Sequence, residues 1–329
     1  MKKATRLRKL LSVAALSLVA VVNTGAAPAA AQDRSTTADQ SSNEAVPEMR
    51  TRMMTSLTGW EVSQYLERND VIFVPVGPTE VNGGSPIDIE YVIPLAYAQE
   101  LAEKGDGLVL PHLTYFYPGG TTTSPATVYV STSESLPYLK ALTRSLIRQG
   151  FRRIVFLTAH GPSGNTMLPL VREIYDEYHV PVLWMDTGMV REHIPGEGPP
   201  AFGDGPPNAR QLVTFGSYEL VGRLEDIPVG LSQPQHEIER DPSQLSRYVP
   251  PFNGTPAGSF FSDPVLHGGF VRPITEEQRE EWGTDGAEYI RSQVASFDVK
   301  GMLEELHKRD EYTRVLEERY GDLLPRFDR

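Results

Sequence analysis

Two apolar runs of the sequence end in polar, glycine-rich loops that carry ionisable side chains. Residues 71–76 lead into the loop 77–84, which contains Glu80, and residues 154–157 lead into the loop 158–165, which contains His160. In an open parallel α/β sheet, ligands bind outside the carboxyl ends of the strands. A carboxylate and an imidazole at two such ends can meet in one crevice. Glu80 and His160 are therefore the first candidates for catalysis.

Other polar side chains follow the predicted strands and belong to the same edge of the sheet. They are Asn82, His112 and Asp186. Carboxylate and imidazole groups in a water-poor site suit a borderline divalent metal, which lowers the pKa of a water molecule and polarises a carbonyl. The pattern predicts metal-assisted hydrolysis.

Structural roles stay open at several of these positions, because polar groups at strand ends also cap helices and satisfy loop backbone. Asn165 fits either a substrate contact or the N-cap of the helix that follows it. Asp186 fits a turn cap, and His112, next to Pro111, fits an ordinary loop histidine.

Several other chemistries lack their sequence signals. Neither loop has the spacing of a phosphate-binding loop, and no G-x-G-x-x-G follows a strand. The chain has no cysteine, which excludes a cysteine nucleophile and any disulfide. No G-x-S-x-G elbow is present, although Ser163 lies in a strand-to-helix turn near His160, so a serine hydrolase stays an alternative.

The elements that would position these side chains alternate between helix and strand. The periodicity predicts helices at 58–67, 91–104, 135–149, after 166, near 210–225, at 277–295 and at 299–312, and strands at 71–76, 108–110, 153–159 and 180–185. Near-continuous apolar strands indicate burial on both faces of the sheet. The fold class is therefore α/β, with a mostly parallel sheet flanked by helices.

The first residues predict export. Five positive charges precede an apolar run of residues 10–22, and Ala29, Ala30 and Ala31 supply a small-residue cleavage pattern. We expect a signal peptide at 1–31, a periplasmic or secreted product and no membrane contact after cleavage, with an uncleaved anchor as the alternative. Residues 32–50 predict a flexible tether, 51–320 a single domain and 321–329 a tail.

Charge argues against a nucleic-acid partner. The formal net charge is −12, and removing the five positive charges of the leader takes it to −17. A protein binds a polyanion through a basic surface that releases counterions, which this chain lacks. A small molecule is the expected partner.

Three segments give the chain a resemblance to the creatininase (creatinine amidohydrolase) family. Residues 74–80, Val-Pro-Val-Gly-Pro-Thr-Glu, resemble that family's entry to its metal site, and residues 117–127 resemble its Y-G…F-P-G-T stretch. Residues 150–165, with Gly-Phe-Arg-Arg and then Thr-Ala-His, resemble the segment that ends in its histidine loop. The order and spacing of the three are more specific than any one motif.

The resemblance implies a three-layer fold, a homo-oligomer such as a hexamer, and hydrolysis of a cyclic amide at a two-metal site. Carried over by position, Glu80, Glu90, His160 and Asp204 would hold a divalent metal, zinc or manganese. The ligand set is incomplete, since Asn82 stands where the family has histidine and Glu90 where it has aspartate. Asn82, Gly161, Ser163 and Asn165 are the expected substrate contacts.

Two hypotheses follow from the sequence. In the first, the protein is an exported hydrolase of a small amide, lactam or lactone, with water activated by a metal or by Glu80 or His160 as general base. In the second, it is a binding or scaffold protein that kept the fold and lost the chemistry.

Overall fold

The computed structural model describes residues 49–191, 207–231, 242–243, 258, 260, 267 and 273–324. The predicted signal peptide, almost all of the predicted tether, and Asp204 lie outside these residues. The boundaries of the domain therefore remain predictions. Among the described residues, no helix combines the length and the apolar character needed to cross a bilayer.

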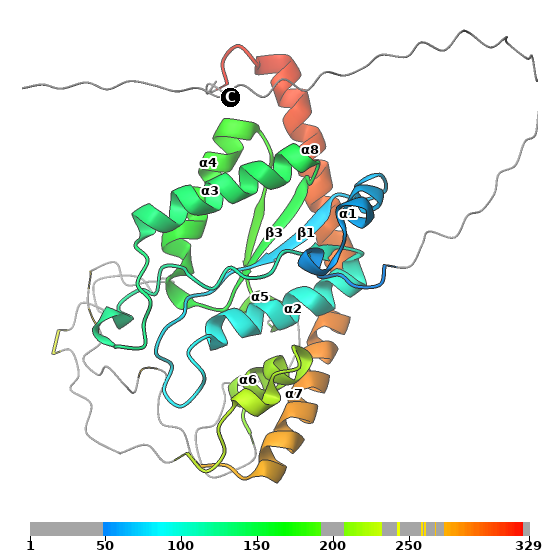
Figure 1. Ribbon diagram of the computed structural model, residues 1–329. Coiled ribbons are helices and arrows are strands. Elements are labelled where there is room, and N and C mark those ends of the chain that lie inside the picture. The colour runs from blue at the N-terminus through cyan, green and yellow to red at the C-terminus, as the bar shows by residue number, and fades with distance from the viewer. Residues whose placement is uncertain are drawn as a thin grey trace, which may run out of the picture. The chain divides into compact units, whose positions relative to one another are not determined.

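A parallel four-stranded sheet forms the centre of the described fold, as Figure 1 shows. The strands are β1 (Val71–Pro75), β2 (Leu108–Val109), β3 (Arg153–Thr158) and β4 (Leu183–Asp186), and the helices are α1 (Gly59–Leu66), α2 (Ile89–Gly105), α3 (Thr132–Gln149), α4 (Gly164–Tyr178), α5 (Gly188–Arg191), α6 (Ala209–Leu220), α7 (Glu276–Ser296) and α8 (Val299–Tyr320). The predicted α/β class with a parallel sheet is confirmed.

The order of the strands is β2-β1-β3-β4. The chain leaves β1 towards β2 on one side and leaves β3 towards β4 on the other, so the direction of winding reverses between β1 and β3. Open α/β sheets bind ligands at such a reversal. In the register of this pair, Val74 lies opposite Phe156 and Pro75 opposite Leu157, and this brings the two polar loops side by side.

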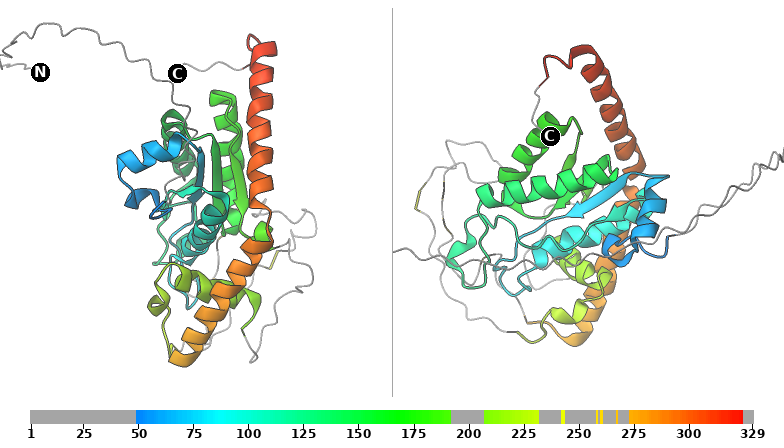
Figure 2. Two further views of the ribbon diagram at one scale, coloured as in Figure 1. Left: turned by 90° about the vertical axis from the view of Figure 1, so that its right-hand side faces the viewer. Right: turned by 45° about the horizontal axis from the view of Figure 1, so that its top comes forward.

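Both faces of the sheet are covered, which gives the three layers that the sequence resemblance implies. Alternate residues of the strands point to opposite faces. One face packs Phe73 and Val155 against α2, α7 and α8, and the other packs Ile72 and Phe156 against α1, α3 and α4. Figure 2 shows α7 and α8 as two long consecutive helices along one side of the molecule.

Local sequence signals explain where several helices begin and end. The predicted capping box at Thr58 is present, with Glu61 as its partner. Gly150 ends α3 with a φ of 112°, a conformation that glycine adopts without steric cost. The start of α3 was predicted too late, because a second capping box at Ser131 and Glu134 begins the helix at Thr132.

Two local predictions are wrong. The strand predicted from residue 180 begins only at Leu183, which fits Pro181, a residue with no N–H to donate to a ladder. The N-cap reading of Asn165 also fails, since Ser163 is the N-cap and Asn165 is the second residue of α4. α8 extends beyond the predicted 312, to Tyr320.

The tightest helix contact outside the sheet joins α6 to α7. A Cβ atom at Gly216 would lie 2.1 Å from the carbonyl carbon of Gly286. The backbones of the two helices can approach this closely only because both positions lack a side chain. The pair continues the core through Phe215, whose ring meets Trp282 edge-on at 5.2 Å between centroids.

We predict that Gly216→Val destabilises the fold by about 1–3 kcal/mol, because the added side chain forces α6 and α7 apart. Urea unfolding followed by circular dichroism measures the change. Gly59→Ala is the matched control, since a Cβ there meets nothing within 4 Å. An unchanged urea midpoint for Gly216→Val would show that the helices separate without cost.

Candidate active site

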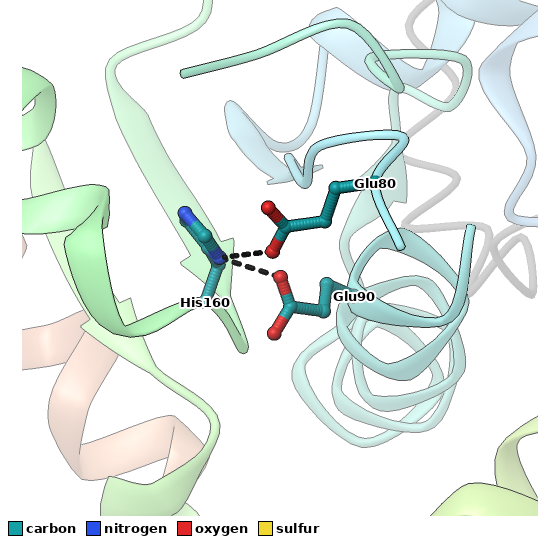
Figure 3. Close-up of side chains that lie close together, drawn as sticks. All are labelled: Glu80, Glu90 and His160. Atoms are coloured by element: carbon teal, nitrogen blue, oxygen red, sulfur yellow. Dashed lines mark hydrogen bonds and ion pairs between the residues drawn. The ribbon is translucent and has the colours of Figure 1, made fainter. Parts of the chain in front are cut away.

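Three of the predicted side chains meet at the reversal between β1 and β3. Glu80 follows β1, His160 follows β3, and Glu90 lies in the first turn of α2. One ligand atom from each side chain lies within 4.8 Å of the other two. Figure 3 shows both carboxylates pointing at the same ring nitrogen of His160.

That nitrogen is Nδ1, which lies 2.5 Å from Glu90 Oε2 and 3.2 Å from Glu80 Oε1. The Glu80 and His160 side chains are almost fully buried, and that of Glu90 is 16% exposed. Nδ1 carries at most one proton, and Glu90 accepts it. Glu80 Oε1 therefore receives no proton from the ring, and neither it nor His160 Nε2 has a hydrogen-bond partner among the described residues.

The start of α2 is held firmly, and this fixes Glu90. A Cβ atom at Gly77 would lie 2.2 Å from the backbone oxygen of Glu90, so glycine lets the helix abut the end of β1. Asp88, just before the helix, accepts hydrogen bonds from Tyr218 at 2.8 Å and from Arg223 at 2.7 Å. Glu90 also gains from the helix dipole, which favours a negative charge in the first turn.

Thr121 holds the other carboxylate. Its hydroxyl donates a hydrogen bond to Glu80 Oε2 inside the protein, where Thr121 is 1% exposed. It begins the short 3-10 helix η2 (Thr121–Thr123). Sequence reasoning missed this residue, although it belongs to the stretch 117–127 that carries part of the family resemblance.

The electrostatics of the site follow from burial and from the close charges. Burial raises the pKa of Glu80, and Glu90 raises it further while His160 opposes both. Burial would also raise the pKa of Glu90, but the attraction and hydrogen bond of His160 outweigh it and lower that pKa. Burial lowers the pKa of His160, yet the attraction of Glu90 and the contacts with both carboxylates raise it to about 10.

Two further residues interact electrostatically with the site, and the sequence analysis named neither. Arg210, in the first turn of α6, helps to lower the pKa of Glu90. Burial lowers the pKa of His267, and the attraction of Glu80 works against that effect. The sequence predicts no strand directly before either residue, so no pattern pointed to them.

The remaining predicted residues do not join the cluster. Asn82 and Ser163 are buried, while Gly161 and Asn165 are exposed. The hydroxyl of Ser163 and Nε2 of His160 are both without a hydrogen-bond partner, so the Ser–His contact of a serine hydrolase is not formed. Asp186 accepts a hydrogen bond from the Gly188 N–H at 2.8 Å, as a turn cap does.

His112 also lies apart from the three. It is exposed, its φ is 76°, and its backbone N–H donates to the Tyr91 hydroxyl at 2.5 Å. His112 therefore fits an ordinary loop histidine better than a residue of the site.

The three converging side chains fit a divalent metal, although they form an incomplete site. Two carboxylates and an imidazole are ligands that zinc accepts, and three protein ligands with one open position are typical of catalytic zinc sites. The two buried atoms without partners, Glu80 Oε1 and His160 Nε2, lack the compensation that buried polar atoms require. An ion among the ligands would satisfy the carboxylate oxygen.

We predict that the metal-free protein loses stability as the pH rises from about 6.5 to about 10. His160 has an ordinary pKa of 6.5 and a folded pKa of about 10, so its contribution is complete below 6.5 and disappears as the pH passes 10. Chemical unfolding at closely spaced pH values, in the presence of a chelator, measures this loss.

His160→Gln should remove most of the decline between those pH values. His307→Gln is the control, because His307 is 41% exposed on α8 and makes only a long contact of 3.5 Å with Glu311. An unchanged decline in His160→Gln would assign it to other groups.

Comparisons with known proteins find one family of similar sequences. The profile of the creatininase family, described as creatinine amidohydrolase, matches residues 55–205, a stretch that contains all three side chains. The creatinine amidohydrolase of Pseudomonas putida is 29% identical over 96 residues. That alignment covers 27% of this chain and 37% of the relative, so it spans little more than a third of the relative's length.

Solved structures resemble the chain more distantly. A Bacteroides fragilis protein described as a creatinine amidohydrolase is 19% identical, with a TM-score of 0.46 over 73% of this chain and 90% of its own. A creatininase named as a manganese form is 18% identical, with a TM-score of 0.43 over 74% of this chain and 97% of its own. A mutant creatininase named as a Zn-Zn type is 19% identical, with a TM-score of 0.43 over 74% of this chain and 97% of its own. Likeness at this level does not transfer a function.

Proposed function

We propose that this chain, which matches the creatininase family over residues 55–205, hydrolyses a small amide, lactam or lactone by metal-assisted attack of water. One observation carries the proposal, namely the convergence of Glu80, Glu90 and His160 at the strand reversal. Two buried carboxylates that face one imidazole are costly for a fold to maintain without a cation. Their convergence supports a working site more than a retained scaffold.

Glu80, Glu90 and His160 would hold the ion, zinc or manganese. When bound there, the ion supplies a water molecule of lowered pKa and polarises the carbonyl under attack. The protein contributes the fixed geometry of the three side chains and a largely buried setting, in which charges interact more strongly than in bulk water.

The residues after β3 would orient the substrate. The backbone N–H groups at the start of α4 point out of a helix N-terminus, where a developing negative charge is stabilised. Gly161 and Asn165 are exposed there and can meet a substrate, and Ser163 adds a hydroxyl with no partner of its own. Substrate contacts from this turn and from Asn82 remain part of the proposal.

Export belongs to the same proposal and rests on the leader sequence. The positive residues, the apolar run at 10–22 and the alanines before Gln32 support cleavage at that point and a periplasmic or secreted enzyme. Intact-mass measurement of the exported protein tests this, and a chain that keeps residues 1–31 would contradict it.

We also propose that the protein assembles as a homo-oligomer, with the hexamer that the family resemblance implies as the first candidate. Light scattering on the purified mature protein measures the mass directly. A monomer at micromolar concentration would refute the assembly without bearing on the site.

We predict that the mature protein, purified without chelator and supplied with zinc or manganese, binds at least one ion per chain. His160→Ala and Glu90→Gln should lose the ion, because each removes one of the three ligands found in the described part of the chain. Elemental mass spectrometry after gel filtration measures the content.

His307→Ala is the matched control for His160→Ala, since it removes an exposed histidine of the same protein. Wild-type protein that stays free of metal would end the metal mechanism.

If the ion binds, cyclic amides, with creatinine first, and lactones should be screened as substrates of the loaded enzyme. Hydrolysis should fall at least 100-fold in both ligand variants.

We also predict that metal affinity rises with pH between pH 6 and pH 8, by at least tenfold per unit. The ion must displace the proton of His160, whose pKa is about 10, and below about pH 7 also that of Glu80, whose pKa burial raises to about 7. Calorimetry with manganese between pH 6 and pH 8 measures the dissociation constant, and buffers of different ionisation enthalpy count the released protons. An affinity independent of pH would place the ion elsewhere.

A further inference from the structure

The stretch 117–128 touches both loops that carry the site. On one side it lies along residues 79–81. The N–H of Val128 donates to the carbonyl of Thr79 at 2.9 Å, and the N–H of Val81 donates to the hydroxyl of Thr127 at 3.3 Å. The backbone on either side of Glu80 is therefore bound to this stretch.

On its other side the same stretch meets the His160 loop. Gly119 has a φ of 68°, and a Cβ atom there would lie 2.7 Å from Cγ of Pro162. Pro162 is two residues after His160 and lies in the 3-10 helix η3 (Gly161–Ser163). Gly119 therefore allows the stretch to pack directly against the turn that presents His160.

Thr121 lies between these two contacts, and its hydroxyl binds the Glu80 side chain itself. The same oxygen is 3.1 Å from the carbonyl of Pro118, which locates the hydroxyl relative to its own turn. The hydrogen bond from Ser124 N–H to the Thr121 carbonyl, at 3.0 Å, closes that turn. Thr121 is thus a fixed, buried donor and not a mobile surface side chain.

The two oxygens of Glu80 consequently have different surroundings. Oε2 accepts the hydrogen bond of Thr121, while Oε1 lies 3.2 Å from His160 Nδ1 without a hydrogen bond. A carboxylate held by one oxygen cannot rotate freely about its last torsion angle. The free oxygen then faces the imidazole.

We propose that Thr121 is a positioning residue, which binds Glu80 Oε2 and thereby presents Oε1 to the site as the single available ligand atom. The metal-binding test of this inference rests on the proposed function. The hydrogen bond from Thr121 and the orientation of Glu80 that it fixes are properties of the protein without a metal. Partners that orient a ligand typically change metal affinity by 10- to 100-fold when removed. Thr121 should therefore affect the affinity for the ion without touching it.

The experiment compares Thr121→Val, which keeps the shape and loses the hydroxyl, with Thr121→Ser, which keeps the hydroxyl. Thr122→Val is the control, as a neighbour in η2 with a partly exposed side chain. Calorimetry with manganese should show a dissociation constant at least tenfold weaker in Thr121→Val, near wild type in Thr121→Ser and unchanged in Thr122→Val. Equal affinity in Thr121→Val and wild type would overturn the proposal.

A second readout uses the metal-free protein, so that the proposal does not fail merely because the ion is absent. The long-range ¹H–¹⁵N NMR spectrum of the His160 ring, at one fixed pH, reports the contact of Nδ1 with the carboxylates. The ¹⁵N chemical shift of His160 Nδ1 should change in Thr121→Val and return towards the wild-type value in Thr121→Ser.

These two readouts separate the hypotheses. Wild-type protein that binds neither manganese nor zinc, with a changed ring spectrum in Thr121→Val, refutes the proposed function and supports the role of Thr121. An unchanged ring spectrum refutes that role. If circular dichroism shows that Thr121→Val does not fold, Thr121→Ala takes its place. A wild-type ring spectrum in Thr121→Ala would likewise refute the role of Thr121.

Discussion

The structure depends on one interaction, the contact of a buried imidazole with two carboxylates. Glu80 and Glu90 both direct an oxygen at His160 Nδ1, in a place that water barely reaches. Two negative groups at this distance would repel each other strongly in a poorly polarisable interior. A cation between them relieves this repulsion, and either a protonated His160 or a divalent ion can provide it, while the raised pKa of Glu80 reflects the same repulsion together with burial.

The sheet and the first turn of α2 make this contact unavoidable. The parallel register of β1 with β3 places two loops at one edge, and the reversal of winding between those strands leaves that edge open. Gly77 then lets α2 begin close enough to β1 for Glu90 to reach the same point. The chemistry thus depends on a close backbone approach as much as on the charged residues.

The chain departs from the pattern of the creatininase family, which it matches over residues 55–205, in the residues that make up the site. Asn82, at a position where the resemblance implies histidine, is buried but is not one of the three converging side chains. The three that remain come from three separate segments and suit a single ion with an open position better than a pair of ions. Arg210 adds a positive charge near this set and helps to lower the pKa of Glu90.

The sequence by itself determined the class of fold and the two anchors of the site. Apolar runs, capping boxes and the glycine after α3 are local signals, so the elements could be predicted from neighbours in the chain. Glu80 and His160 could be named because parallel strands end at one edge. The tertiary structure decided that Glu90, which only the family resemblance had implied, meets them, that His112 and Asp186 do not, and that Thr121 binds Glu80. These outcomes depend on strand register, on the start of a helix and on contacts between segments distant in sequence, and no local pattern encodes those distances.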